Sequence, residues 1–194
     1  LLRVTATVPA TAGYGAARRR SGRPTRVLVT AFTRNAIGNV LDAVVARQVA
    51  HDPGGAALIY FGDPPEAGLA AGVAHLERKE AHAVVRDLAS GNAVVGMTVW
   101  SLHRLLAQGA PPGGDRMTAP LFDLVCVDEA SQVVLGHGLM ALAGLAPSGR
   151  VVVAGDDRQL PPIRAGRPVR VGGRELGGSL YAFLKSVHAG QMAL

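Results

Sequence analysis

The chain has 194 residues, of which 48% are hydrophobic, so it is long enough for one α/β domain with a sizeable core. Its 20 lysine and arginine residues outnumber its 14 aspartate and glutamate residues, and the net charge of +6 fits a polyanionic partner or simply a solvated basic surface. An intrachain disulfide is excluded because Cys126 is the single cysteine, and no apolar run reaches the roughly 20 residues of a membrane span, so we expect a cytoplasmic protein with no membrane partner.

Short apolar runs alternate with segments of helical periodicity along the chain, a pattern that predicts successive β-α units. The first 25 residues contain an arginine cluster and are predicted to form a basic, irregular segment, whereas residues 26–194 are predicted to form the domain. Strands are predicted over residues 26–31, 56–61, 93–98, 122–127 and 150–154. Helices are predicted over residues 35–50, 69–88, 101–108, 133–145 and 179–187. Loops or irregular segments are predicted over residues 109–120 and 163–178.

Two apolar runs end abruptly in acidic or amide side chains. One precedes Asp128 and Glu129, and the other precedes the segment from Gly155 to Gln159. Buried parallel strands bring side chains to the carboxyl edge of an α/β sheet in this way. An aspartate at a strand end can hold Mg²⁺ through water, and its neighbour can orient or deprotonate an attacking water. The Asp-Glu pair alone would more often be an ordinary helix cap, but the second run strengthens the interpretation as a phosphate site.

These runs resemble two motifs of the superfamily 1 helicases, in the branch of the nonsense-mediated decay RNA helicase and the Dna-two-type nuclease-helicases. Asp128-Glu129-Ala130-Ser131-Gln132 resembles motif II, and residues 155–162 resemble motif III. Residues 29–36 resemble motif Ia, and order and spacing match from about residue 26 to residue 187. The pattern is also similar to bacterial helicase modules fused behind a RecB-like nuclease domain. The resemblance implies a RecA-like fold of the P-loop NTPase superfamily, in which helices cover both faces of a mostly parallel sheet.

The resemblance also implies roles for individual residues in a site for ATP and Mg²⁺. Asp128 would coordinate Mg²⁺ through water, and Glu129 would be the catalytic base. Gln159 would sense the γ-phosphate, while Gly155 and Asp156 would shape the turn that carries it.

Motif Ia of the family contacts a single strand of nucleic acid, which implies a second group of site residues. The candidates for contacts to single-stranded DNA or RNA are Phe32, Thr33, Arg34 and Asn35, with Thr98 as a weaker one. Hydroxyl and amide groups can position phosphates, and an aromatic ring can stack on a base. A core position would explain Phe32 equally well. The other expected partner is the second RecA-like domain of the same parent chain.

The sequence departs from the family in one respect that bears on activity. A phosphate-cradling loop requires Gly, four residues, Gly-Lys and then Ser or Thr, and neither Lys79 nor Lys185 follows a glycine. We therefore expect a fold that lacks its first strand and nucleotide loop, cut from a longer ATP-dependent helicase and inactive alone. The alternatives are a nucleic-acid-binding remnant without catalysis and an interaction module that binds no substrate.

Overall fold

The computed structural model describes residues 24–51, 55–108, 121–156, 158–162 and 169–187, and these residues form an α/β domain around a six-stranded sheet. All pairings in this sheet are parallel, and the strand order is β3-β2-β4-β1-β5-β6. The strands are β1 (Arg26–Ala31), β2 (Ala57–Phe61), β3 (Ala74–Leu76), β4 (Ala93–Gly96), β5 (Phe122–Asp128) and β6 (Leu145–Val153). The predicted α/β fold with a mostly parallel sheet is confirmed.

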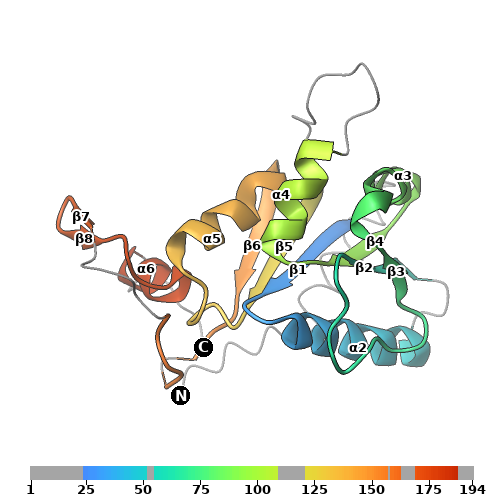
Figure 1. Ribbon diagram of the computed structural model, residues 1–194, viewed down its shortest axis with the longest axis horizontal. Helices are drawn as coiled ribbons and strands as arrows, with labels where there is room; N and C mark the ends of the chain where they lie inside the picture. Colours follow the sequence, from blue (N-terminus) through green and yellow to red (C-terminus); the bar gives the residue numbers. More distant parts are fainter. Residues whose placement is uncertain (1–23, 52–54, 109–120, 157, 163–168, 188–194) are drawn as a thin grey trace.

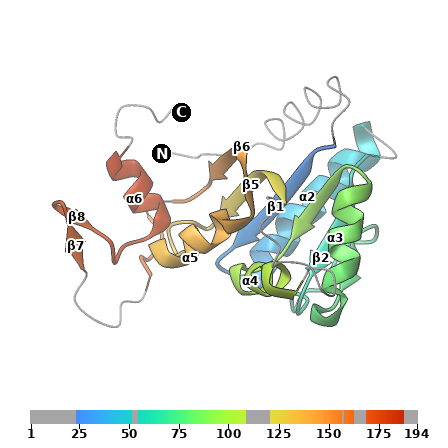
Figure 2. The same cartoon turned by 90° about the horizontal axis from the view of Figure 1, so that it is seen from above.

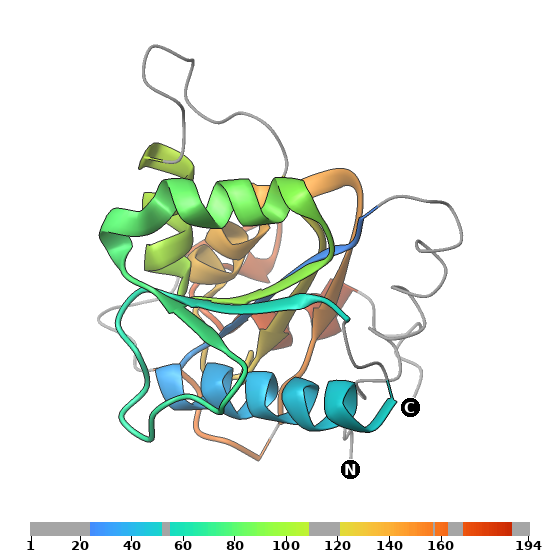
Figure 3. The same cartoon turned by 90° about the vertical axis from the view of Figure 1, so that its right-hand side faces the viewer.

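Helices cover both faces of the sheet and connect its successive strands, except that a segment without a helix joins β2 to β3 (Figure 1). They are α2 (Arg34–His51), α3 (Ala81–Ser90), α4 (Val99–Gln108), α5 (Leu135–Ala141) and α6 (Leu180–Val187), with single 3₁₀ turns η1 (Arg78–Glu80) and η2 (Leu142–Gly144). Figure 3 shows α2 on one side of the sheet and α3 on the other. A small antiparallel hairpin of β7 (Arg170–Val171) and β8 (Arg174–Glu175) projects beyond α6 (Figures 1 and 2).

Alternating side chains of the central strands build two separate cores, because successive residues of a strand face opposite sides of the sheet. Val27 and Val29 of β1 pack in the core that contains Ile37 and Leu41 of α2. Leu28 faces the other core, in which residues of α3, α4, α5 and α6 gather. The central strands β1, β2, β4 and β5 are therefore buried between helices, as their near-continuous apolar runs predicted.

The prediction of one long helix over residues 69–88 is wrong. Residues 74–76 form the edge strand β3, which pairs with β2, and the α-helix begins only at Ala81. Gly68 and Gly72 adopt positive φ angles of 82° and 99°, which interrupt helical geometry in this segment. The Nε2 atom of His75 also lies 2.7 Å from the carbonyl oxygen of Gly62, which ties the new strand to the end of β2.

Boundaries elsewhere differ from the predictions by a few residues. The helix predicted over residues 133–145 is shorter, because η2 follows it and β6 already begins at Leu145, opposite Phe122 of β5. A Cβ on Gly144 would lie 3.1 Å from the Phe122 ring, so this glycine permits the close approach. The segment 163–178, predicted to be irregular, contains the β7–β8 hairpin. Residues 1–23 and 109–120, predicted to be irregular or loop, lie outside the described residues.

Within the described ranges, no helix combines the length and the apolar character needed to cross a bilayer.

Candidate functional site

The carboxyl ends of β1, β5 and β6 meet at one edge of the sheet, since these three strands are parallel neighbours (Figure 1). Ala31 of β1 is in register with Asp128 of β5, and Val127 of β5 is in register with Val153 of β6. The segments that resemble motifs Ia, II and III therefore leave the sheet side by side.

Glu129 is connected directly to the segment that follows β1. Its Oε2 atom accepts hydrogen bonds from the Thr33 backbone N–H at 3.1 Å and from the Thr33 hydroxyl at 2.9 Å. Its own N–H donates to Asp128 Oδ1 at 2.8 Å, and its carbonyl oxygen accepts from the Gln132 N–H at 2.8 Å. The Glu129 backbone has a φ of 50°, a left-handed conformation that costs an ordinary residue about 1 kcal/mol or more. Strained backbone at a strand end is typical of functional sites.

Gln159 is joined to the motif II segment through Ser131. The Ser131 hydroxyl donates to Gln159 Oε1 at 3.0 Å, and Gln132 Nε2 donates to the same oxygen at 3.3 Å. The Asp156 N–H completes the connection, because it donates to Ser131 Oγ at 3.4 Å. Ser131 is buried, whereas Asp156 and Gln159 are exposed. The segments that follow β5 and β6 therefore share one polar network.

Gly155 lies where the turn after β6 passes closely beneath α6. A Cβ at this position would be 2.8 Å from the Tyr181 ring and 3.1 Å from the Ser131 nitrogen. The neighbouring backbone is also fixed, because the Ala130 N–H donates to the Ala154 carbonyl at 2.8 Å. A larger residue at position 155 would therefore push apart the motif II and motif III segments.

The four motif Ia candidates lie between β1 and the first turn of α2. Phe32 is 56% exposed, so the alternative that it is a core aromatic is wrong. Thr33 caps α2, since its Oγ1 accepts the Ala36 N–H at 3.2 Å. Arg34 and Asn35 are exposed, and Asn35 lines a small polar recess between α2 and the segment 65–70.

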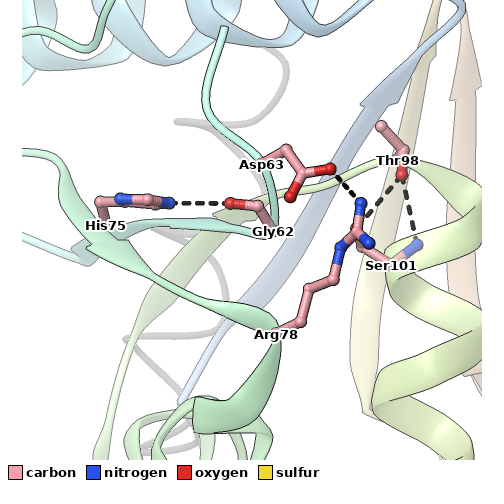
Figure 4. Close-up of polar contacts among 6 residues, drawn as sticks. All are labelled: Gly62, Asp63, His75, Arg78, Thr98 and Ser101. Atoms are coloured by element: carbon pink, nitrogen blue, oxygen red, sulfur yellow. Dashed lines mark hydrogen bonds and ion pairs between the residues drawn. The ribbon is translucent and has the colours of Figure 1, made fainter.

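Thr98 occupies a different part of the same edge, after β4, on the opposite side of β1 from β5. Its Oγ1 accepts the Ser101 N–H and donates to the Ser101 hydroxyl, both at 3.2 Å, so it caps the start of α4 (Figure 4). Figure 4 also shows an ion pair between Asp63 and Arg78 near this cap. Helix capping alone therefore accounts for a threonine at position 98.

Asp128 has the chemistry expected of a magnesium ligand, because Mg²⁺ prefers oxygen donors and keeps several waters. It is half-buried at the tip of β5, where Oδ1 accepts the Glu129 N–H. Across the described part of the chain, no three histidine, cysteine, aspartate or glutamate residues gather into a metal site. Asp128 could hold such an ion through water, as the resemblance of its motif implies.

Cys126 lies two residues before Asp128 and is a packing residue. Burial raises the pKa of its thiol to about 12, and the negative charge of Asp128 acts in the same direction. The thiol is therefore neutral at physiological pH.

Two connections in this edge were not predicted from the sequence. The sequence identified Ser131 only as part of motif II. Its place directly after Asp128 and Glu129 could have indicated that its hydroxyl bonds to the segment after β6. The bonds from Thr33 to Glu129 join residues 96 positions apart, and only the pairing of β1 with β5 reveals them.

Comparisons with known proteins agree with the fold and the motifs. The model of the AAA domain family matches residues 72–177, which include the motif II and motif III segments. The chain is also 44% identical over 82 residues to an ATP-dependent RecD2 DNA helicase of Deinococcus radiodurans. That match covers 39% of this chain and 11% of the relative, so the chain spans only a small part of that protein's length. The chain belongs to the AAA domain family, and its domain is RecA-like, of the superfamily 1 helicase type.

Proposed function

We propose that this domain forms part of an ATP-driven motor that moves along single-stranded DNA, with Glu129 as the catalytic base. The observation that carries the proposal is the Asp128-Glu129 pair at the tip of β5: Glu129 is bonded to Thr33 after β1, and Ser131, two residues further on, is bonded to Gln159 after β6. Membership of the AAA domain family supports the use of ATP. The relative named as a DNA helicase supports DNA as the substrate.

The acidic and amide side chains would divide the work of phosphoryl transfer. Bound Mg²⁺ would neutralise charge that develops on the phosphates, and Asp128 would hold it through water. Glu129 would orient the attacking water and accept its proton. The Gln159 amide oxygen is held by Ser131, which leaves its two N–H donors to contact the terminal phosphate.

The nucleic acid would lie along the segment between β1 and α2. Phe32 exposes enough of its ring to stack on a base, and Arg34 supplies a positive charge for a phosphate. Asn35 and Thr33 would position the backbone. A second RecA-like domain would supply the arginines that stabilise the transition state, an effect of about a thousandfold or more.

The test uses the extended protein, meaning this chain together with whatever sequence flanks it in its own gene. ATP hydrolysis is measured in the presence of single-stranded DNA or RNA. We expect Glu129→Gln to lower kcat by about 100-fold or more, because a positioned general base contributes that much. The matched control is Glu66→Gln, which neutralises an exposed carboxylate outside the site and should leave kcat unchanged.

The same assay distinguishes the motor from its alternatives. An extended protein that binds single strands but hydrolyses no ATP would be a non-catalytic binding remnant. If RNA stimulates hydrolysis and DNA does not, the substrate assignment is wrong while the enzymatic role stands.

A further inference from the structure

A recess lies between the first half of α2 and the segment that follows β2. One side is formed by Asn35, Gly38, Asn39 and Asp42 of α2, and the other by Pro65 and residues 67–70. Figures 1 and 3 show this segment running alongside α2. Of the lining residues, only Asn35 belongs to the segment 29–36 that resembles motif Ia. The proposed function therefore leaves most of the recess without a role.

Backbone contacts give the recess a defined shape. The Ala70 N–H donates to Asp42 Oδ1 at 3.3 Å, which ties the end of the segment to α2. The Gly68 N–H donates to the Pro65 carbonyl at 3.1 Å, and Gly68 has a φ of 82°, which favours glycine. A Cβ on Gly38 would lie 3.2 Å from Pro65 Cγ, so a glycine here lets the segment approach closely. The recess is therefore present without a ligand.

The size and walls of the recess suit one nucleobase. Its volume is about 220 Å³. Because an engineered protein cavity of about 150 Å³ holds benzene, the recess has room for two fused rings. Pro65, Ala67 and Leu69 supply apolar groups against which the face of a base can pack. A phosphate group is disfavoured there, because the Asp42 carboxylate repels it.

The polar side chains of the recess complement the pairing edge of guanine. Asn39 and Asp42 are three residues apart, so they lie on one face of α2. The Asn39 amide can donate to a carbonyl oxygen, whereas the Asp42 carboxylate can only accept. On this edge guanine presents a carbonyl oxygen and two adjacent N–H donors, and each of the other three DNA bases presents only one donor group. A carboxylate therefore favours guanine, because two donors can reach it at once.

The recess also lies next to the proposed path of the strand. Asn35 belongs both to the motif Ia segment and to the recess, and exposed Phe32 and Arg34 come shortly before it. We infer that the recess holds one guanine base of the bound strand and gives the motor a local sequence preference. This inference rests on the proposed function, since it assumes that the strand follows the motif Ia segment.

Binding of single-stranded DNA to the extended protein tests the inference. The probes are short dye-labelled oligothymidylates of equal length in which one central nucleotide is dT, dG, dC or dA, and their affinities are measured by fluorescence anisotropy. We expect the dG probe to bind about tenfold more tightly than the dT probe, because a pair of hydrogen bonds discriminates between bases to about this extent. The dA and dC probes should bind within about twofold of the dT probe, since neither offers two adjacent donors.

Asp42→Asn tests the carboxylate, because the amide oxygen of asparagine can still accept the Ala70 N–H. We expect this variant to bind the dG and dT probes with affinities within about twofold of each other. The matched control is Glu66→Gln, which neutralises an exposed carboxylate of the same segment that is not among the lining residues. The control should keep the preference for guanine, because removal of this charge affects all four probes alike.

A second variant addresses the possibility that position 42 is needed for folding. Asn39→Ala removes the donor to the guanine carbonyl oxygen and should reduce the preference about threefold, the usual effect of one hydrogen bond. Thermal unfolding followed by circular dichroism checks that each variant is folded. The comparison of the four probes needs no variant, so the parent protein alone can overturn the inference.

The outcomes separate this inference from the proposed function. If the four probes bind equally, if dA or dC binds most tightly, or if Asp42→Asn retains the preference, the guanine site is disproved while strand binding still supports the motor. If no probe binds, the strand contact of the proposed function fails, and this inference fails with it. Hydrolysis by Glu129→Gln is measured separately and decides the catalytic role in either case.

Discussion

The neighbouring strands β5 and β6 have similar apolar sequences but very different surroundings. Val125 of β5 and Val151 of β6 are partners in register, yet Val125 is fully buried and Val151 is 38% exposed. β5 has a strand on each side, whereas β6 is the last strand of the sheet in the described residues. Position in the sheet, rather than composition, therefore decides burial. Asp128 and Glu129 extend from the well-packed strand, and Gln159 follows the less protected one.

The largest expected difference between the two strands concerns thiol reactivity. Because burial raises the pKa of Cys126 to about 12, its alkylation at pH 8 should be about a thousandfold slower than that of a free thiol. The measurement is the rate of reaction with iodoacetamide. A Val151→Cys variant that also carries Cys126→Ala places the thiol on β6 and should react far faster. Equal rates would show that β5 opens as readily as β6.

The Cys126 thiol also links stability to pH. The pKa of this thiol is raised in the folded state. Its contribution to the free energy of unfolding is therefore fully present below the unfolded pKa of about 8.5. That contribution is lost as the pH rises toward about 12. Between these values, the free energy of unfolding should fall less steeply with pH in Cys126→Ala than in the parent.

Truncation of the paired valines compares the two strands by stability. We expect Val125→Ala to lower the free energy of unfolding by about 2–3 kcal/mol, because it removes buried methyl groups from a packed core. Val151→Ala should cost less than about 1 kcal/mol, since water already reaches that side chain. Chemical denaturation of both variants is the measurement. Similar losses would mean that β6 is covered in solution.

The connection between the two strand ends should contribute less. Ser131→Ala removes a buried hydroxyl that donates to Gln159 and accepts the Asp156 N–H, and we expect a loss of about 1–2 kcal/mol. Ser148→Ala, at an exposed position of β6, is the control and should be nearly neutral. If the two variants are equally stable, the network contributes nothing measurable.

The smallest effect is expected at Gln159. Its side chain is exposed, so Gln159→Ala should change the free energy of unfolding by less than about 0.5 kcal/mol. Thermal unfolding of this variant beside Ser131→Ala checks whether the buried partner carries the connection. A larger loss for Gln159→Ala would reverse that assignment.

The sequence predicted the central strands well because their apolar runs are uninterrupted and flanked by turn residues. β1 and β5 begin where predicted, and Asp128 and Glu129 lie at the end of β5 as expected. Strand β3 was missed because Ala74, His75 and Leu76 have no strong strand preference of their own. Pairing with β2 makes them a strand, and that pairing depends on tertiary structure.

Part of the candidate site was likewise beyond sequence reasoning. The motifs identified Asp128, Glu129 and Gln159 as a group, and strand order then placed Thr33 beside Glu129. Since β1 could have paired with other strands, no spacing rule predicts a bond between residues 96 positions apart. The exposure of Phe32 also required the structure, because a bend after β1 turns this residue away from the core.

Because β6 is the last strand of the sheet within the described part of the chain, protein concentration becomes an experimental variable. A parallel edge strand presents a row of backbone donors and acceptors that another chain can use. The nine residues of β6 include an exposed valine and only one charged residue, Arg150, and Pro147 blocks pairing only near the start of the strand. Samples for the binding and unfolding measurements should therefore be kept dilute and checked for self-association by light scattering.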